Sequence, residues 1–161
     1  SLSSRKSDER YAFHMTNNDI TASGHDRWLY LFVAWIIAVA ASLGALFMGE
    51  VVGQAPCSLC WHQRAFMFPL AILLGVASFR SDAGAWRYAL PLAAIGMAIA
   101  GFHSLLYAGF IPEGIQPCSQ GPSCASADMT ILGMLPLPYL SLAAFAVIAI
   151  ALIGSRPKAA S

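Results

Sequence analysis

The chain of 161 residues is 58% hydrophobic and only 11% charged, whereas a soluble domain carries roughly 25% charged residues. Its formal net charge of +1 gives no electrostatic basis for binding nucleic acid. The composition therefore argues against a soluble domain and a nucleic-acid-binding protein, and it favours an integral membrane protein.

Residues 1–27 are polar, rich in Ser, Asn, Asp and Arg, and are expected to form a solvated, mobile cytoplasmic tail. The following run, 28–49, contains no charged residue or histidine and reaches the roughly 20 residues that a helix needs to cross a bilayer. Ala38-Val39-Ala40 resembles a signal-peptide cleavage site, but the long polar stretch before the run argues against cleavage.

Three further apolar segments predict three further membrane helices. The second extends back to Trp61, which brings Arg64 to the membrane boundary, and the fourth has its true start near Pro136. A soluble bundle would need a polar face on each helix, and these helices lack one. We therefore expect an all-α integral membrane protein, a four-transmembrane-helix bundle over residues 28–154, with helices at about 28–49, 61–79, 88–111 and 131–154 and a cytoplasmic tail at 155–161.

The positive charges outside the membrane segments lie before the first helix, between the second and third, and after the fourth: Arg5, Lys6, Arg10, Arg27, Arg80, Arg87, Arg156 and Lys158. The other two loops, near 50–60 and 112–128, contain no Lys or Arg. By the positive-inside rule both termini are cytoplasmic and these two loops are extracytoplasmic. Each loop carries one cysteine pair, in a compartment where disulfides persist.

Two small-residue motifs, Ala40-x-x-x-Gly44 and Gly96-x-x-x-Ala100, have the spacing that lets membrane helices approach closely. They indicate helix packing and suggest no chemistry.

The stretch CSLCWHQR places Cys57 and Cys60 at the start of the second helix. Haem attachment is excluded because Trp61, and not histidine, follows the second cysteine. A four-thiolate zinc site built with the second cysteine pair, two structural disulfides, and a redox-active pair remain as alternatives. The redox-active pair is favoured, because the helix N-terminus and Arg64 both stabilise a thiolate at Cys60.

Arg64 has an alternative explanation, because basic side chains near helix ends often extend to the lipid headgroups. Cys60 and Arg64 are, however, four residues apart, on one helix face and about 6 Å apart along the axis. A cation beside a thiolate at the lipid boundary forms a site for a lipid-soluble electrophile. A quinone fits, since a guanidinium can hydrogen-bond its carbonyl oxygen.

CSLCWHQR followed by FMFPLAILLG resembles the signature of the DsbB/BdbC family, membrane thiol:quinone oxidoreductases that make disulfides for the cell envelope. LPLPYLSLAAF and the histidine of FHSLLY resemble this family too. The resemblance covers residues 28–154. It implies a bacterial inner-membrane protein that reoxidises a DsbA-like thioredoxin-fold dithiol oxidase and uses ubiquinone or menaquinone as its cofactor.

The resemblance also implies a role for each site residue. Cys57 and Cys60 form the quinone-proximal pair, with Cys60 nearest the ring, and Arg64 binds the quinone. Cys118 and Cys124 form the shuttle pair, in which Cys118 takes the mixed disulfide with the partner and Cys124 exchanges with Cys57. The five residues between Cys118 and Cys124 resemble the BdbC branch, whereas the best-known Gram-negative pattern has a longer loop.

His103 is expected about 12 Å along the helix axis from Ile111, on the side of the membrane interior. Either its ring nitrogens are hydrogen-bonded between packed helices, or it hydrogen-bonds a quinone carbonyl or helps to deliver protons to the hydroquinone. Gln63 stands where the family has an acidic residue before the arginine, so no carboxylate proton relay is expected. The remaining histidines, His14, His25 and His62, are expected at the surface, and no metal site is expected.

Two functions of other kinds remain open. A vitamin K epoxide reductase-like enzyme also combines four helices, quinones and cysteine pairs, but it carries its CxxC near the last helix, whereas Cys57 and Cys60 precede the second. A non-enzymatic membrane protein would use its disulfides only as structural links, and these would resist mild reduction.

Overall fold

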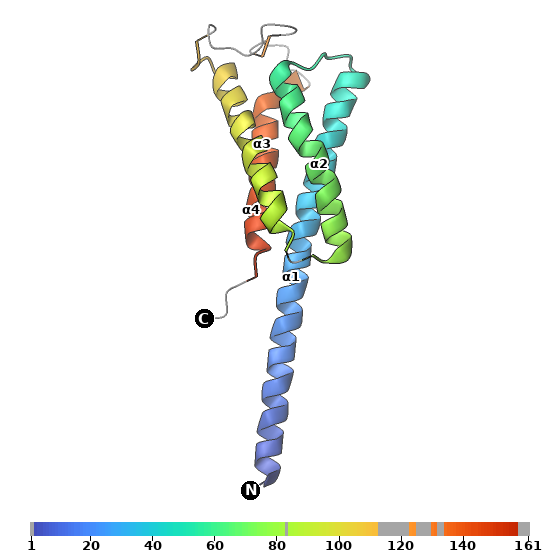
Figure 1. Cartoon of the computed structure of the whole chain (residues 1–161), viewed down its shortest axis with the longest axis vertical. Coiled ribbons are helices and arrows are strands. Elements are labelled where there is room, and N and C mark those ends of the chain that lie inside the picture. Colours follow the sequence, from blue (N-terminus) through green and yellow to red (C-terminus); the bar gives the residue numbers. More distant parts are fainter. Residues whose placement is uncertain (1, 83, 113–122, 125–129, 132–133, 158–161) are drawn as a thin grey trace.

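The part of the chain that the computed structural model describes has four helices and one short antiparallel strand pair (Figure 1). It describes residues 2–82, 84–112, 123–124, 130–131 and 134–157, and only the backbone of residues 2–23 and 131. The elements are α1 (Leu2–Glu50), α2 (Ser58–Arg80), α3 (Trp86–Tyr107), β1 (Thr130–Ile131), β2 (Leu135–Pro136) and α4 (Leu137–Gly154). The all-α, four-helix fold expected from the sequence is confirmed.

The first helix is longer than expected. α1 runs without interruption from Leu2 to Glu50, so the polar segment expected to form a mobile tail at 1–27 is helical from residue 2 (Figure 1). No proline interrupts this stretch, and extending an existing helix is far more favourable than starting one. The part of α1 that is apolar enough to cross a membrane is Gly24–Glu50.

α2 begins at Ser58, ahead of the predicted start at residue 61, because Cys57 caps it. The Cys57 sulfur accepts a hydrogen bond from the backbone N–H of Cys60 at 3.4 Å. This contact satisfies one of the donors that every helix N-terminus leaves without an intrahelical partner. At the other end, Ser81 adopts a left-handed φ of 52°, so that its N–H reaches carbonyls of the last turn.

The third and fourth helices are shorter than expected. α3 ends at Tyr107 and not at 111, and Gly109 follows with a φ of +80°, a conformation that ends helices and suits glycine. α4 begins at Leu137 and not at 131, because Pro136 is extended and β2 pairs with β1 just before the helix. The start near Pro136 is thereby confirmed.

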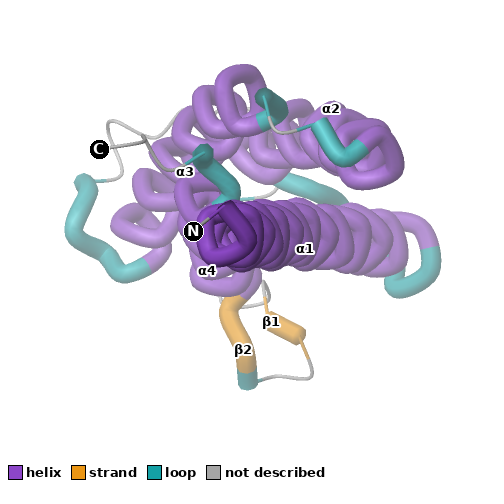
Figure 2. The backbone as a smooth tube through the Cα atoms, turned by 90° about the horizontal axis from the view of Figure 1, so that it is seen from below, coloured by secondary structure: helices purple, strands orange, loops and turns teal. Residues whose placement is uncertain are grey.

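The four helices form a closed ring. α1 packs against α2 and α4, and α3 packs against the same two helices, as the view along the bundle shows (Figure 2). The end of α1, the start of α2, the end of α3 and the start of α4 lie at one end of the bundle, and the end of α2 and the start of α3 lie at the other (Figure 1). Cys57 therefore lies at the opposite end of α2 from Arg80.

All four helices are long and apolar enough to cross a membrane. Large apolar side chains point outward along them, including Ile72, Phe79 and Ile150, which are 70%, 79% and 68% exposed. Such continuous apolar exposure is rare on soluble proteins and suits contact with lipid. The chain is a multi-pass membrane protein.

Only one of the two small-residue motifs joins helices closely. At Gly96 of α3 an added Cβ would overlap the buried Phe145 ring of α4, so that motif does permit close packing. At Gly44 of α1 an added Cβ would meet nothing within 4 Å. The close approach between α1 and α2 instead lies at Gly75, where a Cβ would be 2.9 Å from Trp35 Nε1.

Candidate active site

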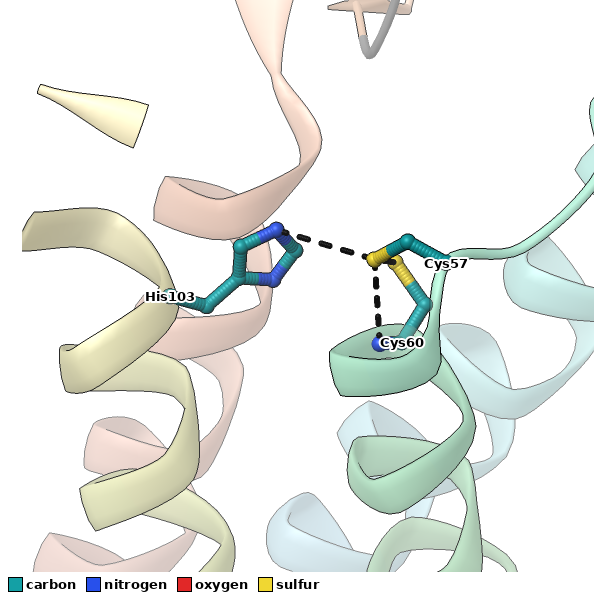
Figure 3. Close-up of side chains that lie close together, drawn as sticks. All are labelled: Cys57, Cys60 and His103. Atoms are coloured by element: carbon teal, nitrogen blue, oxygen red, sulfur yellow. Dashed lines mark hydrogen bonds between the residues drawn. The ribbon is translucent and has the colours of Figure 1, made fainter. Parts of the chain in front are cut away.

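Cys57 and Cys60 meet at the N-terminus of α2, where their sulfur atoms are 3.0 Å apart (Figure 3). Both are free thiols. Cys57 is buried, with 1% of its surface exposed, whereas Cys60 is half-buried. Because the cap folds the Cys57 side chain back over the helix start, the pair lies close enough to form a disulfide with a small movement.

Hydrogen bonds at Cys57 favour the thiolate form of this residue. The hydrogen bond from the Cys60 thiol, followed by His103 and the Cys60 backbone N–H, holds the pKa of the Cys57 thiol well below its usual range, although burial opposes this. The sequence placed the thiolate on Cys60. The structure places it on Cys57 because the capping residue receives the hydrogen bonds that the helix N-terminus offers.

His103 brings α3 into the site. Its Nε2 atom lies 3.9 Å from the Cys57 sulfur (Figure 3). The same atom lies 3.1 Å from the backbone carbonyl oxygen of Cys124. Its Nδ1 atom lies 3.0 Å from the side-chain nitrogen of Gln63 in α2. The imidazole is 1% exposed, so these contacts replace water around it.

These contacts define the tautomer of His103. A carbonyl oxygen only accepts hydrogen bonds, so Nε2 carries the hydrogen and donates it to Cys124. Nδ1 then has a lone pair and accepts an N–H from the Gln63 amide. The Nε2–H of the ring therefore faces the Cys124 backbone and the Cys57 sulfur.

Arg64 points inward between two helices. One guanidinium nitrogen donates a hydrogen bond to the Ala45 carbonyl of α1 at 2.6 Å, and the guanidinium carbon lies 5.5 Å from the centre of the Trp61 ring. An added Cβ at Gly49 would lie 3.2 Å from the same group. This geometry argues against a side chain that simply extends to the headgroups.

Cys60 and Arg64 share a cavity of about 400 Å³ between α1, α2 and α4. Gln63 and His103 also line it, and most of the remaining wall is apolar. Ala40 and Gly44 also line it, so the small residues of that motif leave room for a ligand where close helix packing was expected. Its volume and mostly apolar lining are those of a small-molecule site.

Cys124 lies in one buried cluster with Cys57, and Cys60, the other residue of the inner pair (Cys57 and Cys60), packs against this cluster. Cys124 is disulfide-bonded and 0% exposed, and the cluster also contains Leu59 and Leu106. Cys118, the other cysteine of the outer pair (Cys118 and Cys124), lies outside the described residues. The sequence predicted both pairs, and the structure brings one member of the outer pair against the inner pair.

The donor atoms of Cys57, Cys60 and His103 lie within 4.8 Å of one another, a set that suits a soft metal such as zinc. A metal there would occupy the same sulfurs that close into a disulfide. The four-thiolate zinc alternative does not fit this structure, because the disulfide-bonded Cys124 offers no thiolate.

Sequence reasoning missed one part of the site, the role of Gln63. Gln63 was noted only for lacking a carboxylate, yet it is buried and orients His103. Its spacing of three residues from Cys60 put it on the same helix face, and this signal was available. The histidines His25 and His62 are exposed as expected, and the side chain of His14 lies outside the described part.

Comparison with known proteins agrees with this geometry. The family model "Disulfide bond formation protein DsbB" matches residues 26–154. A "Probable disulfide formation protein" of Metapseudomonas resinovorans is 59% identical over 81% of this chain and 92% of its own length. "Disulfide bond formation protein C" of Bacillus subtilis is 39% identical over 78% of this chain and 91% of its own, and a "Probable disulfide formation protein" of Deinococcus radiodurans is 42% identical over 73% and 82%.

No solved structure matches the chain significantly. The matched region begins just before the predicted first membrane segment and ends with α4, so it contains both cysteine pairs. The chain belongs to the DsbB family of disulfide bond formation proteins, and it is a disulfide-forming membrane oxidoreductase.

Proposed function

We propose that this oxidoreductase reoxidises a DsbA-like dithiol oxidase of thioredoxin fold and passes the electrons to a membrane quinone. The observation that carries the proposal is that the inner pair lies next to both the outer cysteine Cys124 and the apolar cavity. Cys57 packs in one buried cluster with Cys124, and Cys60 lines the apolar cavity. Electrons that enter at the outer disulfide thus have a direct route to a lipid-soluble acceptor.

In the first step, a partner thiolate attacks Cys118, forms a mixed disulfide and releases Cys124 as a thiolate. The second partner thiol then displaces Cys118, so the partner leaves with a disulfide and both outer cysteines are reduced. The complete burial of Cys124 supports this assignment, because a soluble partner cannot reach its sulfur directly.

In the second step, the Cys124 thiolate attacks Cys57 of the inner disulfide and Cys60 leaves as a thiolate. Cys118 then attacks Cys124, the outer disulfide closes, and Cys57 is released. The products are an oxidised outer pair and two free inner thiols. That combination agrees with the free thiols of Cys57 and Cys60 and the disulfide-bonded Cys124 found here.

The cavity residues fit a quinone, either ubiquinone or menaquinone. Apolar walls suit its ring, Arg64 can donate to a ring carbonyl, and Cys60 presents its sulfur to the same space. When bound, the quinone would accept the two electrons and two protons of the inner dithiol, which closes again to a disulfide.

The proposed location is the bacterial cytoplasmic membrane, with both cysteine loops extracytoplasmic. The charge pattern supports this orientation, because Arg80 and Arg87 flank the connection at the end of the bundle away from Cys57. An outer disulfide on the extracytoplasmic side is protected from cytosolic reductants.

The proposal is tested by anaerobic turnover. Purified protein in detergent is mixed with reduced thioredoxin-fold dithiol oxidase and a soluble quinone, and quinone absorbance and partner thiols are followed together. We expect one quinone reduced for each partner disulfide formed. Cys60→Ser should abolish quinone reduction and still allow one stoichiometric exchange at an outer pair that starts oxidised.

Trapping distinguishes a relay from two structural disulfides. In Cys124→Ser the thiol that reverses the mixed disulfide is missing, so an adduct of Cys118 with oxidised partner should accumulate on non-reducing gels. If outer-pair variants oxidise the partner at the normal catalytic rate, the outer disulfide is only a structural link and the proposed function is wrong.

A further inference from the structure

We propose that His103, held in place by Gln63, connects the two cysteine pairs during disulfide transfer: its Nε2–H holds the Cys124 backbone and hydrogen-bonds the Cys57 sulfur as that sulfur leaves. The inference rests on the relay proposed above and adds the residues that carry its internal step. Gln63 acts through His103 and is a positioning residue.

The geometry places one nitrogen between the two pairs. His103 Nε2 lies 3.1 Å from the Cys124 carbonyl oxygen and 3.9 Å from the Cys57 sulfur. His103, Cys57 and Cys124 are each at most 1% exposed, so no bulk water can replace the imidazole in either contact. The ring of His103, which belongs to α3, therefore contacts both Cys57 at the start of α2 and the outer cysteine Cys124.

Gln63 fixes the direction of the donor. Its amide lies 3.0 Å from Nδ1, on the side of the ring away from the sulfur, and is 8% exposed. While the amide N–H occupies Nδ1, the ring hydrogen stays on Nε2. Without that contact the hydrogen can move to Nδ1, and Nε2 would then present a lone pair to the Cys124 oxygen and to a thiolate. Both contacts would become repulsive.

The same contacts leave His103 poorly suited to the role suggested by its sequence. A quinone carbonyl needs a hydrogen-bond donor, and the only N–H of the ring is directed at Cys124. Nδ1 is occupied by Gln63. Although the imidazole lines the cavity, Nε2 faces the Cys124 carbonyl and Nδ1 faces the Gln63 amide. The geometry therefore assigns it to the exchange between pairs.

The step that benefits is the release of Cys57. In the mixed disulfide between Cys57 and Cys124, an incoming outer thiolate forms a new bond to Cys124 and the Cys57–Cys124 bond breaks. The electron pair goes to the Cys57 sulfur, which leaves as a thiolate. A leaving thiolate that receives hydrogen bonds leaves faster. The Nε2–H supplies one such bond and also holds the Cys124 backbone beside the reacting sulfurs.

The test measures transfer between the pairs without quinone. Fully oxidised protein is mixed with a limiting amount of reduced thioredoxin-fold oxidase, quenched in acid at set times, and its thiols are mass-tagged at each cysteine. In the unmodified protein the thiols should appear first at the outer pair and then at the inner pair. In His103→Phe, transfer to the inner pair should slow by about tenfold or more, so that thiols accumulate at the outer pair before they appear at the inner pair.

Two variants separate hydrogen bonding from simple packing. His103→Gln places an amide N–H near the position of Nε2 and should recover most of the lost rate, whereas His103→Phe keeps ring volume without a donor. Gln63→Met preserves side-chain length but removes the amide, and should slow the same step by roughly threefold to tenfold. Circular dichroism checks that each variant remains helical, and Gln63→Met serves if His103→Phe does not fold.

A second readout responds to hydrogen bonding at the sulfur and not to packing. In the reduced protein, the pH profile of Cys57 alkylation should move to higher pH in His103→Phe and return in His103→Gln. Besides His103, the Cys60 thiol acts on Cys57, and the Arg64 guanidinium acts on Cys60. Cys60 and Arg64 are retained in these variants.

The outcomes distinguish this inference from the proposed function. If the unmodified protein never moves thiols from the outer to the inner pair, the relay itself fails. If it does so, and His103→Phe transfers at the same rate, only the role of His103 is wrong. Equal slowing in His103→Phe and His103→Gln would reduce the residue to a packing element and overturn the inference.

Discussion

Arg64 of α2 donates a hydrogen bond to the backbone carbonyl of Ala45 in α1, with 2.6 Å between nitrogen and oxygen. The carbonyl of a helix interior normally accepts only from its own helix, so a second donor to it ties the two helices together beside the cavity. The guanidinium has further N–H groups, which extend the donor set toward the cavity that Arg64 lines.

Removing this guanidinium should weaken quinone use. We expect Arg64→Ala to raise the apparent quinone KM about tenfold or more, because a charge-assisted hydrogen bond is lost. Arg64→Lys should recover little, since the forked, planar donor is not replaced. Steady-state quinone reduction measures both. Arg80→Ala, at the other end of α2, is the matched control and should keep normal kinetics. Normal kinetics in Arg64→Ala would leave headgroup contact as the better explanation.

Filling the cavity from α1 should have a similar effect without disturbing the bundle. An added Cβ at Gly44 meets nothing within 4 Å, and Gly44 lines the cavity. We expect Gly44→Leu to raise the quinone KM by competing for space, with little change in melting temperature. Gly44→Ala, the smaller control, should stay close to normal in both measurements. A large loss of stability in Gly44→Leu would mean that the space is closed in the folded protein.

Gly96 should tolerate no side chain. A Cβ there would overlap the Phe145 ring, which is completely buried, so Gly96→Ala must move α3 and α4 apart. Overpacking of this kind costs about 1–3 kcal/mol. Thermal unfolding in detergent measures it. Gly101→Ala on the same helix is the control, because its Cβ would meet only Leu142 Cδ1, at 4.0 Å. Equal melting temperatures for the two variants would contradict the close packing.

The reactivity of Cys57 should persist in acid. Its pKa lies well below the usual thiol range, chiefly because the Cys60 thiol donates to it. In the reduced protein, the alkylation rate of Cys57 should therefore stay nearly constant as pH falls below the ordinary thiol pKa of about 8.5. It should drop only near its own lowered pKa.

The sign of the stability effect follows from the same shift. A group with a depressed pKa in the folded state stabilises that state above its unfolded pKa, and the contribution disappears as pH falls through the folded pKa. Melting of the reduced protein should show this loss on acidification, and Cys57→Ser should lack it. A profile that follows an ordinary thiol would disprove the charge assignment.

The membrane orientation is tested by labelling. We expect a membrane-impermeant thiol reagent to modify Cys118 from the extracytoplasmic side after mild reduction. Reporter fusions at either terminus should be active only in the cytoplasm, since Arg80 and Arg87 flank the connection at the end of the bundle away from Cys57. Labelling of Cys118 only from the cytoplasmic side would reverse the assignment.

The sequence was sufficient for the helices, the thiol pairs and the shared face of Cys60 and Arg64, because each depends on periodicity or local spacing. It was not sufficient for contacts between helices. The cap formed by Cys57, which shifts the charge of the pair, depends on backbone geometry at a single residue. The hydrogen bond between Gln63 and His103 joins residues far apart in the chain, and no spacing rule relates them.

The helix boundaries failed where local signals competed. Apolar residues continue past Tyr107 and begin before Leu137, so hydropathy extended both helices. In the structure α3 ends just before Gly109, and α4 begins directly after Pro136. Gly44 shows the same limit for packing. Its motif is a genuine small-residue pair, but in the structure the space beside these small residues belongs to the cavity.

The burial of Cys57 and Cys124, at 1% and 0% exposure, also has a consequence for selectivity. Small reductants dissolved in water therefore reach either sulfur much more slowly than they would reach an exposed one. In the proposed relay, the partner protein would reduce the outer pair, and a ligand of the apolar cavity that Cys60 lines would reoxidise the inner pair. Low-molecular-weight thiols are therefore poor reductants of Cys57 and Cys124, and the redox state of these cysteines follows the partner and the ligand of the cavity in the proposed relay.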